Sequence, residues 1–164
     1  MELVAVVAMT KDRIIATETG VPWDHPDDVS QYKNRVANNP VIVGRTTYES
    51  MLPDPPGSQH LVLSQSLEET NSKTVTIVNT VREALSVAAD MDAHTIYVVG
   101  GGQTYKSLLK EYNRIVVTIV DDVINPDEYD RIVRFPEWRG DNWIRANIDD
   151  SYKDFRIEFW KSTN

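Results

Sequence analysis

An acidic residue near the start of a predicted helix is the first candidate for chemistry. The helix is expected over residues 27–37. It places Val29, Tyr32 and Val36 along one apolar stripe, and Asp28 points along the same stripe. An ionised carboxylate among apolar side chains is costly unless a partner compensates its charge. Asp28 is therefore either a ligand-binding group or an ordinary acid of the first helical turn, which the helix dipole favours.

Two strand-to-helix junctions carry glycine and are candidates for phosphate binding. The first reads Val43-Gly44-Arg45-Thr46-Thr47 and the second reads Val99-Gly100-Gly101-Gly102-Gln103-Thr104-Tyr105. Glycine lets the backbone approach a ligand closely, and free amides at a helix start attract anions. Neither junction matches the dinucleotide or nucleotide-hydrolase glycine patterns. Two such junctions on one sheet could hold the two ends of one diphosphate.

Short apolar runs separated by helical patterns predict an α/β fold. Strands are expected at 3–8, 41–43, 61–63, 75–78, 96–99 and 115–120, and further helices at 45–50, 81–91 and 103–109. Alternating strands and helices predict a central, mainly parallel sheet with helices on both faces. Residues 155–159 alternate apolar and charged side chains, which predicts an antiparallel C-terminal strand at or near the edge. Thr80 and Glu83 are spaced as a capping box, and residues 9–24 and 121–143 are expected to be long loops.

Length and composition narrow the classes of function. The 164 residues predict a single domain, and the absence of cysteine excludes thiolate chemistry. His25, His60 and His94 show no metal-ligand spacing, so no metal is expected. The net charge of −8 argues against a nucleic-acid partner, and no apolar run could cross a membrane. Because the chain starts with a strand pattern and not with a signal-peptide pattern, we expect a cytoplasmic protein. Adaptation to high salt is one hypothesis for its acidic composition.

The order and spacing of several motifs resemble the dihydrofolate reductase family from about residue 2 to residue 160. They are Val6-Val7-Ala8, Pro22-Trp23 with Asp28, Val43-Gly44-Arg45-Thr46-Thr47-Tyr48-Glu49-Ser50, Pro56-Gly57, and Val99-Gly100-Gly101-Gly102 followed by Tyr105. The resemblance implies that NADPH reduces 7,8-dihydrofolate to tetrahydrofolate. It also implies one domain over residues 1–164, with an adenosine-binding part at about 39–93 and a loop-rich remainder.

The resemblance also implies roles for individual side chains at the substrate. Asp28 would accept two hydrogen bonds from the pterin 2-amino and N3 positions. Thr118 would support the same pocket through its hydroxyl and a water, and Trp23 would order water near the reacting bond. The substrate-binding walls would come from Val6, Ala8, Val29, Tyr32, Ser50, Met51 and Val99.

For the cofactor, the resemblance implies that Arg45 and Ser64 meet the 2′-phosphate and select NADPH. The full set of cofactor-binding residues would be Ala8, Ile15, Gly44, Arg45, Thr46, Thr47, Leu63, Ser64, Gly100, Gly101, Gly102, Gln103, Thr104 and Tyr105. The Gly100–Gly101 bond is the family's position for a cis peptide. The segment at residues 9–24 would close over the nicotinamide and exclude water. Hydride would pass from nicotinamide C4 to pterin C6, with N5 protonated by solvent.

Three positions depart from the family pattern. Ala16 stands where a glycine is common, which restricts the backbone of the first loop. Ser58 replaces the arginine that usually holds the α-carboxylate of the folate tail. Residues 131–134 replace the usual Gly-Asp-Thr before an aromatic-proline pair.

Three other interpretations compete with this one. A reductase of the same fold could act on a pyrimidine precursor of riboflavin, although such an enzyme should lack Pro22-Trp23 with Asp28. A catalytically silent NADPH-binding module would keep the glycine junctions, and Ala16 and Ser58 leave room for it. A structural or interaction protein would explain neither junction. We expect a monomer by default, because no feature of the sequence indicates an oligomer.

Overall fold

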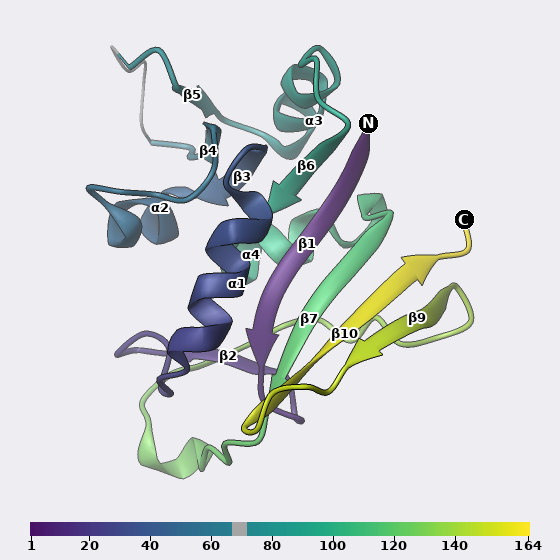
Figure 1. Cartoon of the computed structure of the whole chain (residues 1–164). Helices are drawn as coiled ribbons and strands as arrows, with labels where there is room; N and C mark the ends of the chain where they lie inside the picture. Colours follow the sequence, from purple (N-terminus) through teal and green to yellow (C-terminus); the bar gives the residue numbers. More distant parts are fainter. Residues whose placement is uncertain (67–71) are drawn as a thin grey trace.

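One large sheet forms the centre of the molecule (Figure 1). The computed structural model describes residues 1–66 and 72–164, so residues 67–71 of the predicted adenosine-binding part at 39–93 lie outside the described residues. The strands are β1 (Glu2–Met9), β3 (Pro40–Gly44), β4 (Gln59–Leu63), β5 (Val75–Val78), β6 (Thr95–Val98), β7 (Arg114–Val120), β9 (Trp143–Asp149) and β10 (Phe155–Ser162). Their spatial order is β5-β4-β3-β6-β1-β7-β10-β9. The first six pair in parallel, and β10 runs antiparallel to both β7 and β9, which confirms the predicted fold class.

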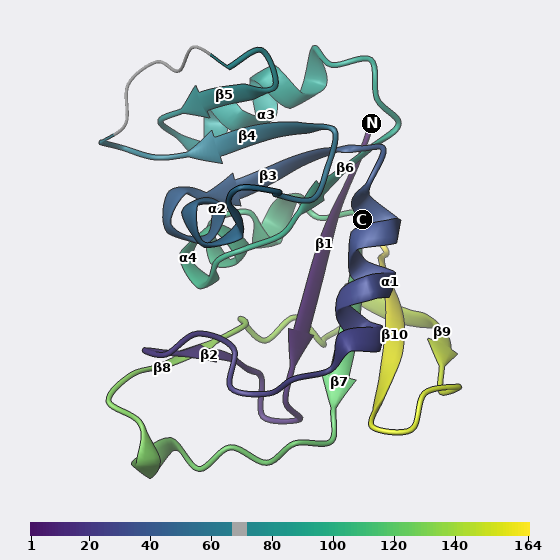
Figure 2. The same ribbon diagram turned by 60° about the vertical axis from the view of Figure 1, so that its left-hand side comes forward.

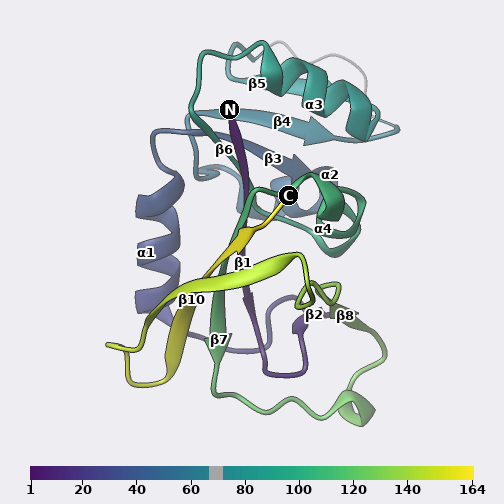
Figure 3. The ribbon, with the colours of Figure 1, turned by 90° about the vertical axis from the view of Figure 1, so that its right-hand side faces the viewer.

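Helices cover both faces of this sheet. They are α1 (Pro26–Val36), α2 (Arg45–Met51), α3 (Val81–Ala89) and α4 (Gly102–Ser107), with short 3-10 helices η1 (Leu109–Glu111) and η2 (Pro126–Glu128). Figure 3 shows α1 and α4 on opposite faces. The last helix is shorter than the expected 103–109, because the chain tightens into η1 at Leu109. Helix α3 ends at Ala89 rather than residue 91.

The start of α3 shows how local sequence fixes an element. The Thr80 hydroxyl accepts a hydrogen bond from the Glu83 backbone N–H at 3.0 Å. In return, the Glu83 carboxylate accepts from the backbone N–H of Asn79 at 2.7 Å. The predicted capping box is confirmed, with its return bond one residue earlier than the usual partner.

The alternation of side chains along the central strands builds a separate core on each face. On one face, Leu3, Ala5 and Val7 of β1 pack in a cluster with residues of α3 and α4. On the other face, Val4 and Val6 of the same strand pack in a cluster that includes side chains of α1 and α2. Successive residues of a strand point to opposite faces, so one strand anchors both layers. This arrangement fixes α1 and α4 relative to the strand ends between them.

Both predicted long loops contain a strand, which corrects the sequence interpretation. Strands β2 (Ile14–Thr17) and β8 (Ile132–Arg134) pair antiparallel in a separate two-stranded sheet (Figure 2). Ile14 and Phe135 have no exposed surface, and the Phe135 N–H donates to the Arg13 carbonyl at 2.9 Å. Burial of these apolar residues and pairing of their backbones hold the two segments together. Strand β9, beyond the second loop, was also not predicted.

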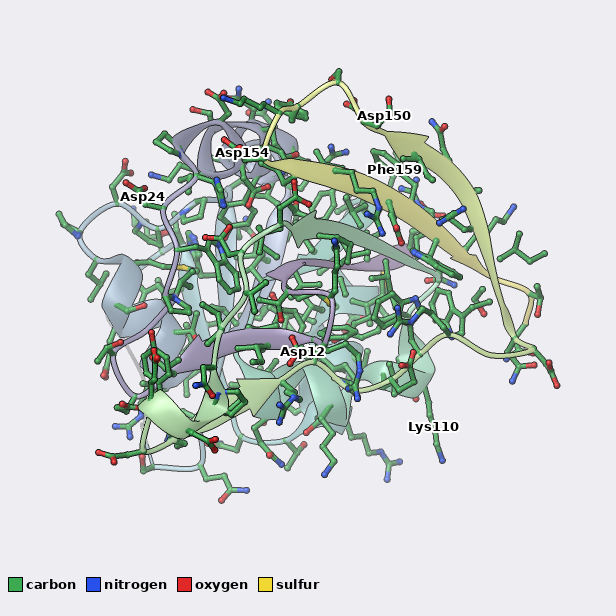
Figure 4. The ribbon with its side chains drawn as sticks, turned by 90° about the horizontal axis from the view of Figure 1, so that it is seen from below. Asp12, Asp24, Lys110, Asp150, Asp154 and Phe159 are labelled. Atoms are coloured by element: carbon green, nitrogen blue, oxygen red, sulfur yellow. The ribbon has the colours of Figure 1, made fainter. Side chains whose placement is uncertain are left out.

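Exposed carboxylates are distributed over the outside of the molecule. Asp12, Asp24, Asp150 and Asp154 lie on three different loops, between β1 and β2, before α1 and between β9 and β10 (Figure 4). Charges dispersed in this way repel each other weakly and keep a surface hydrated. Among the helices that the structure describes, none is both long and apolar enough to cross a membrane.

Candidate active site

A single large cavity of about 1530 Å³ collects the residues that the sequence singled out. It lies at the carboxyl ends of the central parallel strands, where sheets of this kind bind their ligands. All the predicted site residues line it: Val6, Ala8, Ile15, Trp23, Asp28, Val29, Tyr32, Gly44, Arg45, Thr46, Thr47, Ser50, Met51, Leu63, Ser64, Val99, Gly100, Gly101, Gly102, Gln103, Thr104, Tyr105 and Thr118. The individual roles of these residues remain predictions.

The Asp28 carboxylate is buried and is bonded to neutral donors. Its side chain lies in the first turn of α1 and the residue is only 7% exposed. Its Oδ1 accepts hydrogen bonds from the Thr118 hydroxyl at 2.6 Å and from the Gln31 amide at 2.8 Å. Thr118 therefore contacts the carboxylate directly through its hydroxyl. Within the described part of the chain, no Lys or Arg nitrogen lies within 4.0 Å of this carboxylate.

The apolar stripe of α1 is narrower than the sequence predicts. Val36 is fully buried and Tyr32 is half-buried, but Val29 is 45% exposed. Val29 lies on the first turn, where the helix borders the open cavity instead of the core. The Tyr32 hydroxyl oxygen is buried and has no hydrogen-bond partner among the described residues. Burial raises the pKa of Tyr32, so its hydroxyl stays protonated and neutral near physiological pH.

Tyr105 fixes the strand end beside the acid. Its hydroxyl donates to the Val6 carbonyl at 2.6 Å, across the sheet from α4 to β1. Burial raises the pKa of Tyr105 well above its ordinary value, so this donor persists over the whole physiological range. Phe135 packs edge-on against the Tyr105 ring with 5.1 Å between ring centres. The segment after β8 is therefore packed against a cavity-lining side chain.

The two glycine junctions meet each other, as the diphosphate hypothesis requires. The Gly44 N–H donates to the Gly100 carbonyl at 2.8 Å, because β3 and β6 are neighbours in the sheet. A Cβ atom added at Gly44 would lie 2.8 Å from the Thr104 hydroxyl, and one at Gly101 would lie 2.8 Å from the Thr47 hydroxyl. Larger residues would force the junctions apart. The Gly100–Gly101 peptide bond is cis, as predicted.

Two cations line the cavity beside these junctions. Arg45 begins α2, and Arg131 precedes β8 in the segment that was predicted to be a loop. Neither guanidinium forms an ion pair with any residue that the structure describes. The Arg131 backbone N–H donates to the Glu18 carboxylate at 2.9 Å, which ties its position to the end of β2. The cavity is therefore lined by one buried carboxylate on α1 and by two arginines, on α2 and before β8, that form no ion pair within 4.0 Å with the described residues.

Several lining residues were not predicted. His25, Asn79, Thr80, Arg131 and Val133 are among them. Asn79 and Thr80 could have been predicted from the sequence, because they directly follow the expected strand at 75–78 and the carboxyl ends of parallel strands border such cavities. No local signal identified Arg131 or Val133, because their positions depend on the pairing of β8 with β2. Ser58 does not line the cavity, and its side chain is exposed.

The described residues contain no group of three His, Asp or Glu side chains arranged to hold a metal ion. His25 lines the cavity, and its ring lies 2.6 Å from the carboxylate of Asp122, which is not among the lining residues. The site therefore offers one buried acid, hydroxyls, backbone amides and cations as its chemical groups.

Comparison with known sequences defines the class. Residues 2–161 match the family model described as dihydrofolate reductase, so the chain belongs to this family of oxidoreductases. Dihydrofolate reductase HdrB from Haloferax volcanii is 32% identical over 157 residues, which cover 92% of this chain and 78% of that protein. Dihydrofolate reductase 1 from Haloarcula marismortui is 34% identical over 143 residues, 78% of this chain and 77% of that protein. The dihydrofolate reductase of Bacillus subtilis is 25% identical over 149 residues, covering 91% and 84% respectively.

Proposed function

We propose that this protein catalyses the NADPH-dependent reduction of 7,8-dihydrofolate to 5,6,7,8-tetrahydrofolate. The buried Asp28 carboxylate carries the proposal, because it borders the cavity and, among the described residues, its hydrogen-bond partners are neutral donors. The pterin 2-amino group and N3 can donate two parallel hydrogen bonds to one carboxylate. Such a ligand would supply the partner that the protein itself does not.

The other end of the cavity fits NADPH. The junctions at Gly44 and Gly100 touch each other and leave no room for side chains, so the backbone at the starts of α2 and α4 could approach the pyrophosphate closely. Arg45 is suited to the 2′-phosphate, and Thr46 and Thr47 could donate to the pyrophosphate. Bound there, NADPH would supply the hydride that reduces pterin C6.

The side chains of this protein then have distinct tasks. Asp28 would orient the ring and favour its positively charged form, so that N5 takes a proton from solvent before C6 is reduced. Trp23 would order the water near that position. Thr118 holds the carboxylate at 2.6 Å, and Tyr105 holds the Val6 strand end beside it.

The proposal is tested by following NADPH absorbance after addition of dihydrofolate, in dilute buffer and in molar potassium chloride. We expect turnover that methotrexate abolishes. Binding of NADPH without turnover at either salt concentration would instead indicate a silent cofactor-binding module. Reduction of a riboflavin-precursor pyrimidine in preference to dihydrofolate would indicate the other reductase, although membership of the dihydrofolate reductase family favours dihydrofolate.

The protonation step makes a separate prediction about pH. Single-turnover hydride transfer should slow as pH rises from mildly acidic to alkaline values, because N5 loses its proton. Tyr32 and Tyr105 should not contribute, since burial raises the pKa of each. A rate that stays constant across this range would exclude protonation as the step that sets the barrier.

A further inference from the structure

Gln31 contacts Asp28 without lining the cavity. Its side-chain nitrogen donates to Asp28 Oδ1 at 2.8 Å, and its side-chain oxygen accepts from the Arg35 guanidinium at 3.1 Å. The three residues are spaced by three and four positions along α1, so they share one helix face. An Arg–Gln–Asp chain of hydrogen bonds therefore runs along the helix and ends at the acid.

The two neighbours permit only one orientation of the Gln31 amide. An ionised carboxylate can only accept hydrogen bonds, and a guanidinium can only donate them. The amide nitrogen must therefore face Asp28, and the amide oxygen must face Arg35. Leucine would satisfy neither neighbour, and an ionised glutamate would satisfy only Arg35. Glutamine has one donor side and one acceptor side, which this position requires.

Gln31 also separates Asp28 from the nearest cation on its helix. The Arg35 guanidinium lies over the Phe159 ring of β10, 5.3 Å from the ring centre. It makes no ion pair with the described residues, and its Nε is buried without a partner. A direct Arg–carboxylate pair is strong and often bidentate, so it would occupy the acid that a ligand needs.

Both protein donors use the same oxygen of Asp28. Thr118 and Gln31 bond to Oδ1, and the described residues make no hydrogen bond to Oδ2. Oδ1 is held from two elements, β7 and α1, so the plane of the carboxylate is fixed. The second oxygen keeps its full capacity to accept from a bound molecule.

We propose that Gln31 is a positioning residue for the acid, which holds Asp28 Oδ1 and keeps the Arg35 guanidinium from pairing with the carboxylate. The inference deepens the proposed function and rests on it, because it concerns recognition of the pterin. Gln31 acts through Asp28 and needs no contact with the ligand.

The first test is the variant Q31L, with N34L as the matched control. Asn34 lies on the same helix with an exposed side chain, so N34L makes a similar amide-to-leucine change away from the acid. The readout is the dissociation constant of methotrexate, whose 2,4-diaminopteridine edge donates to a carboxylate. We expect Q31L to weaken binding about 10-fold, the scale of one hydrogen bond to a charged group. N34L should leave binding unchanged, and neither variant should change the dissociation constant of NADPH.

The effects of Q31L and N34L on methotrexate affinity are then measured again in a D28N background. If Gln31 acts through the acid, Q31L should change methotrexate affinity by less than about 2-fold once the carboxylate is gone. An equal loss in both backgrounds would overturn the proposal, as would an unchanged affinity when Asp28 is present. Thermal unfolding of each variant separates loss of folded protein from loss of affinity.

The second variant, Q31E, keeps the shape of the side chain and its contact with Arg35. The charged groups around this position are Asp28 and Arg35 on α1, and Asp149 on β9 interacts with Arg35. The introduced carboxyl would face Asp28 as a like charge, so affinity should fall further than in Q31L. The difference in methotrexate affinity between Q31E and the natural protein should become smaller as pH falls, because the protonated carboxyl of the introduced glutamate can donate to Asp28. A difference that does not depend on pH would overturn the proposal.

These measurements use ligand binding and need no turnover. Failure to reduce dihydrofolate would refute the proposed function and leave the coupling between Gln31 and Asp28 to be judged on its own.

Discussion

Two parts of the cavity, which we call the acid end around Asp28 and the cation end around Arg45, hold their charged groups in opposite ways. The acid is buried, and two side chains from different elements hold one of its oxygens at 2.6 and 2.8 Å. Arg45 makes no ion pair with the described residues, and it lies in the first glycine junction between Gly44 and Thr46-Thr47. The acid end is held by protein contacts alone, whereas under the proposed function the phosphates of NADPH would order the cation end.

The largest expected effect tests the acid end. D28N keeps the shape of the side chain but removes its charge, so the pterin ring loses the carboxylate that favours its cationic form. The rate of hydride transfer should fall by about 10²–10⁴-fold, the usual scale for such a group. NADPH affinity, measured by fluorescence titration, should remain within about 2-fold of the original, since Arg45 and the glycine junctions are intact.

The matching change at the cation end is R45Q. Loss of a charge-assisted hydrogen bond costs about 1.5–3 kcal/mol, and partial exposure of Arg45 places the effect near the lower limit. NADPH should bind about 10-fold more weakly, while NADH, which lacks the 2′-phosphate, should be unaffected. Equal weakening of both cofactors would show that Arg45 does not discriminate between them.

Salt concentration should affect ligand binding at the two ends differently, without any mutation. Raising potassium chloride screens exposed charges within a Debye length of about 10 Å at 0.1 M, and affects buried contacts much less. NADPH affinity should therefore fall several-fold, and methotrexate affinity should change little. Melting temperatures in the same series test adaptation to high salt, which the two haloarchaeal relatives make a relevant question. Equal melting temperatures in dilute buffer and molar salt would remove that hypothesis.

The smallest expected effect lies outside both ends. Two hydrogen bonds from Arg139 lower the pKa of Glu137 to about 2, and Arg13 lies 3.4 Å from the same carboxylate. This carboxylate stabilises the fold above its unfolded pKa of about 4.5, and the contribution is lost as pH falls toward 2. Because the group is about half exposed, E137Q should lower the free energy of unfolding by only about 0.5 kcal/mol at neutral pH. Melting curves should show a decrease of about 1–2 °C that disappears in acid, with both ligand affinities unchanged.

The parts of the molecule that could be predicted from sequence are those with a strong local pattern. Buried runs such as residues 41–43 predicted strands, and the spacing of Thr80 and Glu83 predicted the start of α3. Strand β2 was not predicted because it is four residues long and its partner β8 is distant in sequence. Strand β9 was not predicted because most of its residues are exposed, which removes the alternation that identifies a strand.

In the candidate site too, residues with a strong local sequence pattern could be predicted and the others could not. Asp28 conflicted with the apolar side of its own helix, so the sequence identified it as a ligand-binding candidate. Gln31 gave no such signal, because a polar residue on a helix is usually exposed to solvent. The spacing of three residues places Gln31 next to Asp28 on one helix face, but the spacing does not show that the side chain bonds to the acid instead of to water.

The pairing of β2 with β8 has a consequence for how ligands enter. These strands form a sheet of their own, and Ile15, Ala16 and Val133 from it line the cavity. This side of the cavity is thus a single flap made from two distant parts of the chain. Under the proposed function, a movement of this flap that admits a pteridine would either carry both strands together or first break their backbone hydrogen bonds. Substitutions near residue 133 should therefore alter entry rates as directly as substitutions near residue 16.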